Sequence, residues 1–360
     1  MNLIDFHCDT LSECYNRKSE LYKNDLHIDL ERGKRVFNKY CQVFAVWIPD
    51  EKRGDEAYDY FNNVYAFFEK QLLKNYNTVA FCRSSGEMVN AFGENKIAAF
   101  LSVEGGAVLG GDIDVIDALY EKGVRILTLT WNGQNELGDG CFTENAKGLS
   151  PFGVNCVKKL QKKGIIVDVS HLSERGFYDV AEFSEKPFIA THSDCDIVDN
   201  PFAEKRNLTD AQIRIITEQK GIIGLNLYEK FLGVENGAGL CSVIRQIEHF
   251  CSLGAEHTIC LGCDFDGCTV SDDLCGIDKL YKIANGLARE NYSDELINGI
   301  FFDKFAARFN LVSHQHIENL ICLRSIVHRN TCHQTIFRVH GCFPKVGGHP
   351  FHPNLYNVVP

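Results

Sequence analysis

The sequence has no run of about 18 apolar residues, so it contains no segment long and apolar enough to cross a membrane. The first apolar run begins at residue 3, which leaves no room for a signal peptide. Positive charge is also scarce, since 37 Lys and Arg stand against 48 Asp and Glu, for a net charge of -11. A polyanionic partner requires a positive surface. These absences predict a cytoplasmic protein with neither membrane nor nucleic-acid partners.

Eight short apolar segments predict an α/β fold, a (β/α)8 TIM barrel. The segments are apolar throughout, as expected of strands buried on both faces, and most are separated by stretches with helical spacing. The active site of such a barrel lies at the C-terminal ends of the strands. A doubly wound open sheet is the alternative, but no Gly-x-Gly-x-x-Gly follows the first strand. The predicted strands are 3–8, 41–48, 97–103, 124–130, 164–170, 187–191, 221–227 and 258–264, and the predicted helices include 57–74, 115–122, 153–163, 175–182, 210–219 and 240–253.

The cysteine content points to reduced thiols. Sixteen cysteines are scattered through the strands and helices of a large chain, whereas a disulfide framework is typical of small secreted domains. Cys8, Cys260 and Cys263 are expected to pack as small hydrophobic side chains.

Side chains that could bind metal follow several of the predicted strands. His7 and Asp9 come at the end of the first strand, and residues i and i+2 of a strand point to the same side. Glu104, His171 and His192 follow three further strands. Imidazole and carboxylate without thiolate suit Zn²⁺ first, and Mn²⁺, Fe²⁺ or Co²⁺ next. These five side chains could hold two adjacent ions if the Glu104 carboxylate bridges them.

Two such ions roughly 3.5–4 Å apart can hold a hydroxide and polarise the carbonyl that it attacks, so the predicted reaction is hydrolysis. Asp264 follows the eighth strand, where it could take a proton from the water and give it to the leaving amine. Asp266 could do the same. For both residues the alternative is a loop carboxylate that accepts hydrogen bonds from backbone amides, a common use of Asp beside Gly.

From residue 1 to about 310 the chain resembles the membrane dipeptidase family, also called renal dipeptidases. The 21-residue step from His171 to His192 matches the spacing in that family. The matching motifs are His7-Cys8-Asp9, Val103-Glu104-Gly105-Gly106, Asp168-Val169-Ser170-His171, Thr191-His192-Ser193, Arg206-Asn207-Leu208-Thr209-Asp210 and Gly262-Cys263-Asp264-Phe265-Asp266-Gly267.

The resemblance implies a barrel that holds two zinc ions. His7, Asp9 and a bridging Glu104 would bind one ion, and Glu104, His171 and His192 the other. The family hydrolyses dipeptides, including those with a D-residue at the C-terminal side, and its members commonly form homodimers.

The resemblance also implies substrate-binding residues. Arg206 would bind the substrate's terminal carboxylate, which its planar guanidinium suits, although a surface arginine is the alternative. Tyr228 corresponds to a tyrosine that contacts substrate. Family members carry a histidine after the fourth strand that stabilises the oxyanion, and here Leu129 takes that place. Loss of one such donor typically lowers the rate by about 100- to 1,000-fold, unless Asn132 or the indole of Trp131 substitutes.

The last 50 residues differ in composition, which predicts two parts, a barrel over 1–310 and an atypical tail over 311–360. The tail holds seven of the 13 histidines and four of the eight prolines but only one acid, Glu318. We expect it to be poorly ordered and outside the folding constraint of the barrel, as a frameshifted C-terminus would be.

Three functions remain open at this point. The first is a dinuclear zinc dipeptidase. The second keeps the metals but acts on another small amide or a lactone, because barrels of this kind host many chemistries. The third is a metal-binding homologue with weakened or no catalysis, motivated by Leu129.

Overall fold

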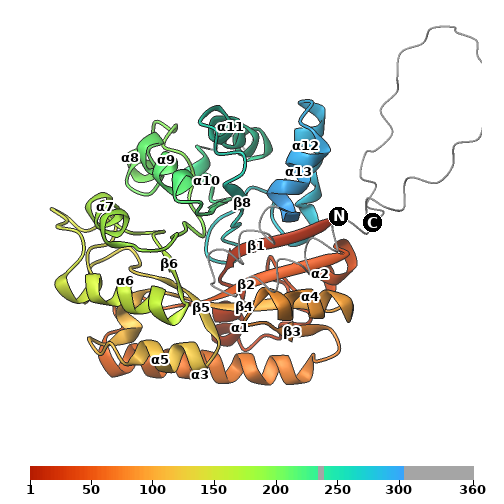
Figure 1. Cartoon of the computed structure of the whole chain (residues 1–360). Coiled ribbons are helices and arrows are strands. Elements are labelled where there is room, and N and C mark those ends of the chain that lie inside the picture. The colour runs from red at the N-terminus through yellow and green to blue at the C-terminus, as the bar shows by residue number, and fades with distance from the viewer. Residues whose placement is uncertain (234–238, 304–360) are drawn as a thin grey trace, which may run out of the picture.

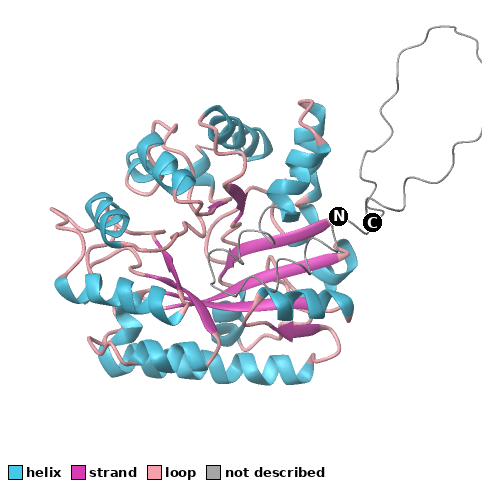
Figure 2. Cartoon of the chain, viewed as in Figure 1, coloured by secondary structure: helices cyan, strands magenta, loops and turns pink. Residues whose placement is uncertain are grey.

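Parallel strands form the centre of the molecule, in the order β6-β5-β4-β2-β1-β8-β7, with β3 paired to β4 beside this path. The computed structural model describes residues 1–233 and 239–303 of the 360. Figures 1 and 2 show the strands at the centre, with helices around them. The strands are β1 (Asn2–Cys8), β2 (Lys39–Trp47), β3 (Val79–Phe81), β4 (Ile97–Glu104), β5 (Val124–Thr128), β6 (Ile166–Asp168), β7 (Ile223–Leu225) and β8 (Ile259–Leu261).

The sheet closes into a ring through residues 189–190, which stand between β6 and β7. Val169 N donates to Ile189 O (2.8 Å) on one side, and Gly224 N donates to Ala190 O (2.8 Å) on the other. These contacts are isolated bridges, so the predicted strand 187–191 is present only as its two central residues. The predicted (β/α)8 barrel is thus confirmed, with a shortened sixth ring member.

The strand β3 was not predicted from the sequence. It pairs with the first part of β4, at Val79↔Ile97, whereas β5 pairs with the last part of the same strand. Three residues are too few to show a hydrophobic period, which is why the sequence gave no signal for this strand.

All six predicted helices are present, and their ends differ from the predicted ones by a few residues at most. Serine or threonine side chains cap several of them, as at Ser150, Ser173 and Thr209, and each accepts a hydrogen bond from the backbone of the first turn. The helices are α1 (Thr10–Arg17), α2 (Leu30–Val36), α3 (Gly54–Lys74), α4 (Ser85–Gly93), η1 (Gly106–Leu109), α5 (Val115–Glu121), α6 (Pro151–Lys163), α7 (Glu174–Phe183), α8 (Pro201–Glu204), α9 (Asp210–Glu218), α10 (Glu229–Leu232), α11 (Gly239–Ser252), η2 (Ile277–Lys279), α12 (Tyr281–Arg289), α13 (Asp294–Asn298) and η3 (Gly299–Asp303).

Three further predictions concern the whole chain. The 13 cysteines in the described part are all free thiols and most are buried, as predicted. Among the described helices, none has both the length and the apolar composition required to span a bilayer. The tail 311–360 lies outside the described residues, so its order and its separation from the barrel stay predictions.

Candidate metal centre

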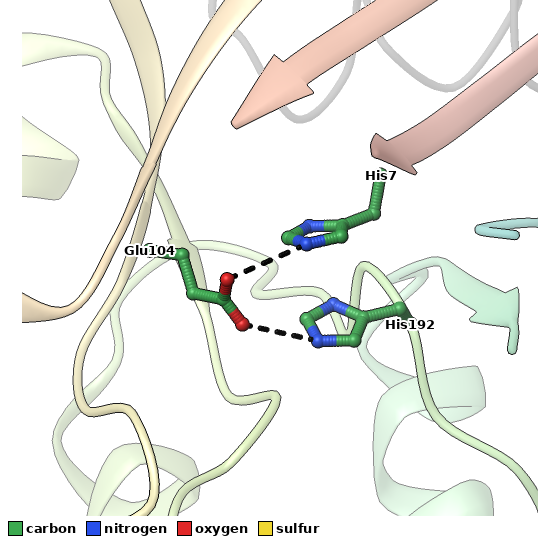
Figure 3. A group of neighbouring side chains, drawn as sticks. All are labelled: His7, Glu104 and His192. Carbon is green, nitrogen blue, oxygen red and sulfur yellow. Dashed lines mark ion pairs between the residues drawn. The ribbon is translucent and has the colours of Figure 1, made fainter. Parts of the chain in front are cut away.

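Three histidines from separate strand ends meet around the carboxylate of Glu104, at the end of β4. One oxygen, Oε2, lies 3.6 Å from His7 Nε2 on β1. The other, Oε1, lies 3.0 Å from His171 Nε2 and 3.3 Å from His192 Nε2. Figure 3 shows the carboxylate facing the rings of His7 and His192, with one oxygen toward each ring. The structure therefore brings together side chains that are up to 185 positions apart in the sequence.

Two acids complete the group on the His7 side. His7 Nε2 lies 3.7 Å from Asp9 Oδ2 and 3.9 Å from Asp264 Oδ1. One oxygen or nitrogen from each of His7, Asp9 and Asp264 lies within 4.8 Å of the others, and so does one from each of His7, Glu104 and His192. The site thus contains two groups of side chains, which share His7, that could hold a cation.

Unsatisfied ligand atoms indicate that these residues fit a metal. His7 Nε2 and Asp9 Oδ1 are buried and have no hydrogen-bond partner among the described residues. The Nε2 atoms of His171 and His192 face each other at 2.9 Å. Buried polar atoms normally have a partner, so a set that points inward at one space suits a bound cation.

Hydrogen bonds fix the tautomers of two histidines in the form that binds metal. His171 Nδ1 lies 2.9 Å from Asn132 Oδ1, which can only accept, so Nδ1 carries the proton. His192 Nδ1 lies 2.8 Å from Thr191 Oγ1, whose own hydrogen goes to Asp168. In both rings Nε2 is left with its lone pair directed into the site.

Asp168 is the buried anchor behind this arrangement, and the sequence assigned it no role beyond membership of a motif. Its carboxylate accepts from the hydroxyls of Thr128 and Thr191 (both 2.6 Å) and from the backbone of Ser170 (3.0 Å) and Thr191 (2.9 Å). In the sequence, the signal that could have identified Asp168 is a charged residue at the end of an apolar strand. These bonds connect β5 and β6 to the segment that carries His192.

The electrostatics favour neutral rings at His171 and His192 beside an ionised carboxylate, whereas, against the effect of burial, Glu104 and Asp9 raise the pKa of His7 well above its ordinary value. Burial and the positive charge of Arg206 lower the pKa of His171 to about 4. Burial and a charged His7 lower the pKa of His192 well below its ordinary value. Burial opposes ionisation of Glu104, but His7 and the other two rings hold its pKa well below the usual range. Neutral imidazole and carboxylate are the forms that ligate metal.

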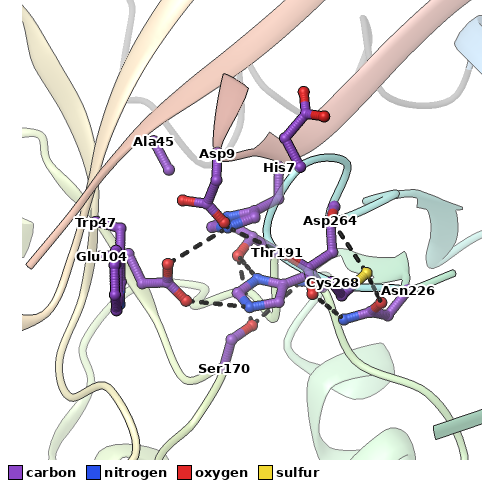
Figure 4. Close-up of polar contacts among 12 residues, drawn as sticks. His7, Asp9, Ala45, Trp47, Glu104, Ser170, Thr191, Asn226, Asp264 and Cys268 are labelled. Atoms are coloured by element: carbon purple, nitrogen blue, oxygen red, sulfur yellow. Dashed lines mark hydrogen bonds and ion pairs between the residues drawn. The ribbon is translucent and has the colours of Figure 1, made fainter. Parts of the chain in front are cut away.

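Asp264 is held by a neighbour that the sequence did not identify. Asn226 Nδ2 donates to Asp264 Oδ2 at 2.9 Å, as Figure 4 shows, and Asp264 N donates to His7 O at 3.1 Å. Asp264 has a left-handed backbone (φ 56°), which is uncommon for a residue other than glycine. Burial raises the pKa of Asp264 to about 6. The polar residue within Leu225-Asn226-Leu227 was the only signal for Asn226.

Four of the metal-facing side chains, Asp9, Glu104, His171 and Asp264, form the floor of an open cavity of about 470 Å³. Tyr228 and Asn132, both predicted to bind substrate, line it. Arg206 does not line it; the side chain is buried, and it donates to Ser193 Oγ (2.8 Å) and His192 O (2.7 Å). The alternative of a surface arginine is therefore wrong. Its binding of a substrate carboxylate stays a prediction.

Two sequence-based interpretations change at this point. Leu129 is fully buried in the hydrophobic core and does not line the cavity, whereas Trp131 does. The packing of Leu129 in the core does not support the prediction that it takes the place of a donor in the cavity. The carboxylate of Asp266 accepts from Thr10 Oγ1 and from His27 N, so the loop-carboxylate alternative describes it well.

A family model described as membrane dipeptidase (peptidase family M19) matches residues 1–307. The chain is 27% identical over 242 residues to an uncharacterized protein in the pqqA 5'region of Klebsiella pneumoniae, covering 64% of this chain and 88% of that protein. It is 32% identical over 231 residues to an uncharacterized protein in the PQQ-III 3'region of Acinetobacter calcoaceticus, covering 57% of this chain and 71% of that protein.

Two solved structures share the fold over nearly their whole length. A metallo peptidase from Rhodobacter sphaeroides, crystallised with a phosphinate mimic of the dipeptide L-Ala-D-Ala, has a TM-score of 0.80 and 24% identity over 87% of this chain and 99% of that one. The metallo peptidase dipeptidase AC has a TM-score of 0.81 and 25% identity over 88% of this chain and 99% of that one. The resemblance predicted from the sequence is confirmed.

Proposed function

The chain belongs to the membrane dipeptidase family of metallopeptidases, and from that premise we propose that it is a dinuclear zinc dipeptidase. One observation carries the proposal. The Glu104 carboxylate has His7 on one oxygen and both His171 and His192 on the other, at the floor of a cavity large enough for a small ligand. A carboxylate with imidazoles on both oxygens suits a bridge between two metal ions.

The residues divide into two ligand sets. His7, Asp9 and Glu104 would hold one ion, and Glu104, His171 and His192 the other. When bound, the ions supply Lewis-acid chemistry that acidifies water and polarises the scissile carbonyl.

Asp264 moves the proton. With Oδ2 held by Asn226, Oδ1 lies on the His7 side, where it would accept a proton from the attacking water and transfer it to the leaving amine nitrogen. A carboxyl with a pKa of about 6 is close to the value that serves both directions near neutral pH. Trp131, Asn132 and Tyr228 provide neutral hydrogen-bond donors on the cavity wall.

The substrate is a dipeptide, including one with a D-residue at the C-terminal side. The Rhodobacter sphaeroides peptidase holds a mimic of L-Ala-D-Ala, and the two chains share a fold. Arg206 would attract the free carboxylate of the substrate. Blocking that carboxylate as an amide is then expected to abolish hydrolysis, and retained hydrolysis of the amide would instead favour a hydrolase of other small amides or lactones.

The test is metal analysis of the purified full chain, alongside amino-acid release from L,L and L,D dipeptides. We expect two equivalents of zinc and turnover. Asp264→Asn should keep the zinc and lose turnover, whereas Asp266→Asn, a matched control in the same loop, should keep most of the turnover. Equal loss in both variants would contradict the role of Asp264, and zinc without turnover of any dipeptide would contradict the function.

A binding protein without catalysis is no longer favoured, because its motivation was Leu129, which lies in the core. The homodimer implied by the family stays a prediction that sedimentation analysis can check.

A further inference from the structure

The loop that follows β8 contains two residues with a left-handed backbone. Asp264 has φ 56° and Asp266 has φ 69°, a conformation that is uncommon for residues other than glycine. Such a conformation persists where the surrounding structure holds it. Asp264 is held by the end of β1, because its N donates to His7 O (3.1 Å). Asp266 is held by a different part of the chain.

His27, in the segment between α1 and α2, makes two hydrogen bonds to Asp266, which lies 239 positions away in the sequence. His27 N donates to Asp266 Oδ1 (2.7 Å), and Asp266 N donates to His27 Nδ1 (3.1 Å). Nδ1 also lies 3.5 Å from Asp266 Oδ1, but the amide hydrogen is directed at it, so Nδ1 carries the lone pair. Burial lowers the pKa of His27, although the Asp266 carboxylate acts in the opposite direction. The neutral ring is the form that accepts this hydrogen bond.

His27 is itself fixed in place. Leu26 and Ile28, its neighbours in the chain, are both buried in the hydrophobic core. His27 O accepts from Ile277 N (3.0 Å), and the ring packs edge-on against Phe265 with the centroids 5.5 Å apart. The Nδ1 atom therefore belongs to a rigid segment, which makes it a fixed support for the loop.

Asp266 connects this support to the acids of the site. Its side chain is only 3% exposed, and its carboxylate also accepts from the hydroxyl of Thr10, the residue that follows Asp9. Its backbone lies two residues after Asp264, the proposed acid and base. Asp9, Asp264 and Asp266 line the cavity, whereas His27 does not. His27 therefore acts on the site through Asp266 and not by contact with substrate.

We propose that His27 is a positioning residue for the reaction: its Nδ1 holds the Asp266 amide, and this bond sets the backbone from which Asp264 reaches the cavity. The inference rests on the proposed function and adds to it a residue from outside the cavity. Without the acceptor on His27, the left-handed conformation of Asp266 is less populated, and Asp264 faces the cavity for less of the time. Proton transfer then slows, whereas substrate binding stays the same. The bond uses the backbone of Asp266, so Asp266→Asn retains it.

Two variants separate the acceptor of His27 from its ring. His27→Asn keeps an acceptor, because the amide Oδ1 takes the place of Nδ1, but it removes the ring. His27→Phe keeps a ring against Phe265 but removes the acceptor. We would measure kcat and KM for a good dipeptide substrate with the zinc-loaded full chain. Hydrogen exchange of the Asp266 amide, followed by mass spectrometry, would report on the loop without depending on turnover.

His27→Phe should lower kcat by about tenfold at constant KM, the effect expected for one neutral hydrogen bond. Exchange of the Asp266 amide should become about tenfold faster or more, because the loop opens more often. His27→Asn should stay close to the parent in both measurements. His27→Gln, whose carbonyl takes the place of Nε2 instead, should behave like His27→Phe and replaces it if that variant folds poorly.

Parental kcat in His27→Phe, together with a loss in His27→Asn, would overturn the inference in favour of ring packing. Faster exchange at unchanged kcat in His27→Phe, or lower kcat at unchanged exchange, would also overturn it. A parent chain that hydrolyses no dipeptide while the variants show the predicted exchange would overturn the proposed function and support the hold of His27 on the loop. Equal exchange in all the chains would overturn the inference whatever they hydrolyse.

Discussion

At the residue scale, the side-chain amide of Asn226 positions Asp264, the proposed general acid and base. Asn226 Nδ2 donates to Asp264 Oδ2, while Asn226 Oδ1 accepts from Tyr228 N (2.7 Å) and Asn226 N donates to Asp194 (3.0 Å). Two hydrogen bonds fix the side chain of Asn226 and one fixes its backbone, so that Asn226 holds Asp264 in one rotamer. It positions the carboxylate without itself touching the floor of the cavity.

Asn226→Leu should lower kcat by about 10- to 100-fold with little change in KM, because a hydrogen bond to a charged group is worth about 1.5–3 kcal/mol. Steady-state kinetics on a good dipeptide substrate would measure it. Zinc content should stay at the parental value. A rise in KM at constant kcat would mean that Asn226 binds substrate instead of orienting Asp264.

Gly267 is the second residue on which the site depends. A Cβ at this position would lie 2.1 Å from Asp9 Oδ2 and 2.6 Å from Asp264 Oδ1, closer than real Cβ contacts. Both carboxylates therefore need a glycine beside them to reach His7. The requirement is for space, since Gly267 is not among the glycines with positive φ.

Gly267→Ala should consequently weaken metal binding, because Asp9 has to move away from the ligand set. Equilibrium dialysis against zinc should give a clear loss of the Asp9-side equivalent. Gly93→Ala is the matched control, since its added Cβ meets nothing within 4 Å. Unchanged zinc stoichiometry in Gly267→Ala would contradict the proposed ligand set.

At the element scale, part of the motif that supports the family resemblance builds a helix and not a site. Thr209 caps α9, accepting from Gln212 N (3.3 Å), while Gln212 Oε1 accepts from Thr209 N (2.9 Å). Asn207, from the same motif, donates to Cys195 O and Phe231 O. Both residues hold the loop that carries Arg206 in place.

Thr209→Ala should lower the free energy of unfolding by about 1 kcal/mol, the usual loss for an N-cap hydroxyl. Urea unfolding followed by circular dichroism would measure the change, and Thr209→Ser should restore most of it. Turnover of the folded variant should be close to parental. A kcat reduced as strongly as in Asp264→Asn would assign this motif to catalysis.

At the scale of the whole molecule, the predicted ligands come from ring members on opposite sides of the barrel, His7 from β1, Glu104 from β4 and His192 after the bridge at 189–190. A cation bound by all of them connects distant parts of the ring. Without it, buried carboxylates and imidazoles have to satisfy one another, which is less favourable.

Removal of metal with a chelator should therefore lower the Tm by several degrees, because a ligand at 100 times its Kd stabilises the native state by about 2.7 kcal/mol. Differential scanning calorimetry would detect the shift. Added zinc should restore the Tm, and magnesium, which prefers oxygen ligands, should not. Equal rescue by both ions would argue against imidazole ligation.

The tail gives a second test at this scale. A chain truncated after Asn310 should keep the parental Tm and zinc content, since the composition of 311–360 does not continue the barrel pattern. Thermal unfolding and metal analysis of the truncated chain measure this. A large fall in Tm would show that the barrel needs the tail.

The sequence alone determined the barrel and the candidate ligands, because apolar runs buried on both faces and polar residues at their ends are local patterns. It assigned no role to Asn226 or Gly267, because each acts through side chains from other strands and loops, and among the aromatic side chains that line the cavity it singled out only Trp131 and Tyr228. The place of Leu129 was decided only in three dimensions, where its side chain packs into the core and Trp131 faces the cavity. The direction in which a side chain points at the end of a strand depends on how the backbone turns after the last hydrogen bond to the neighbouring strand. Tertiary packing sets that turn.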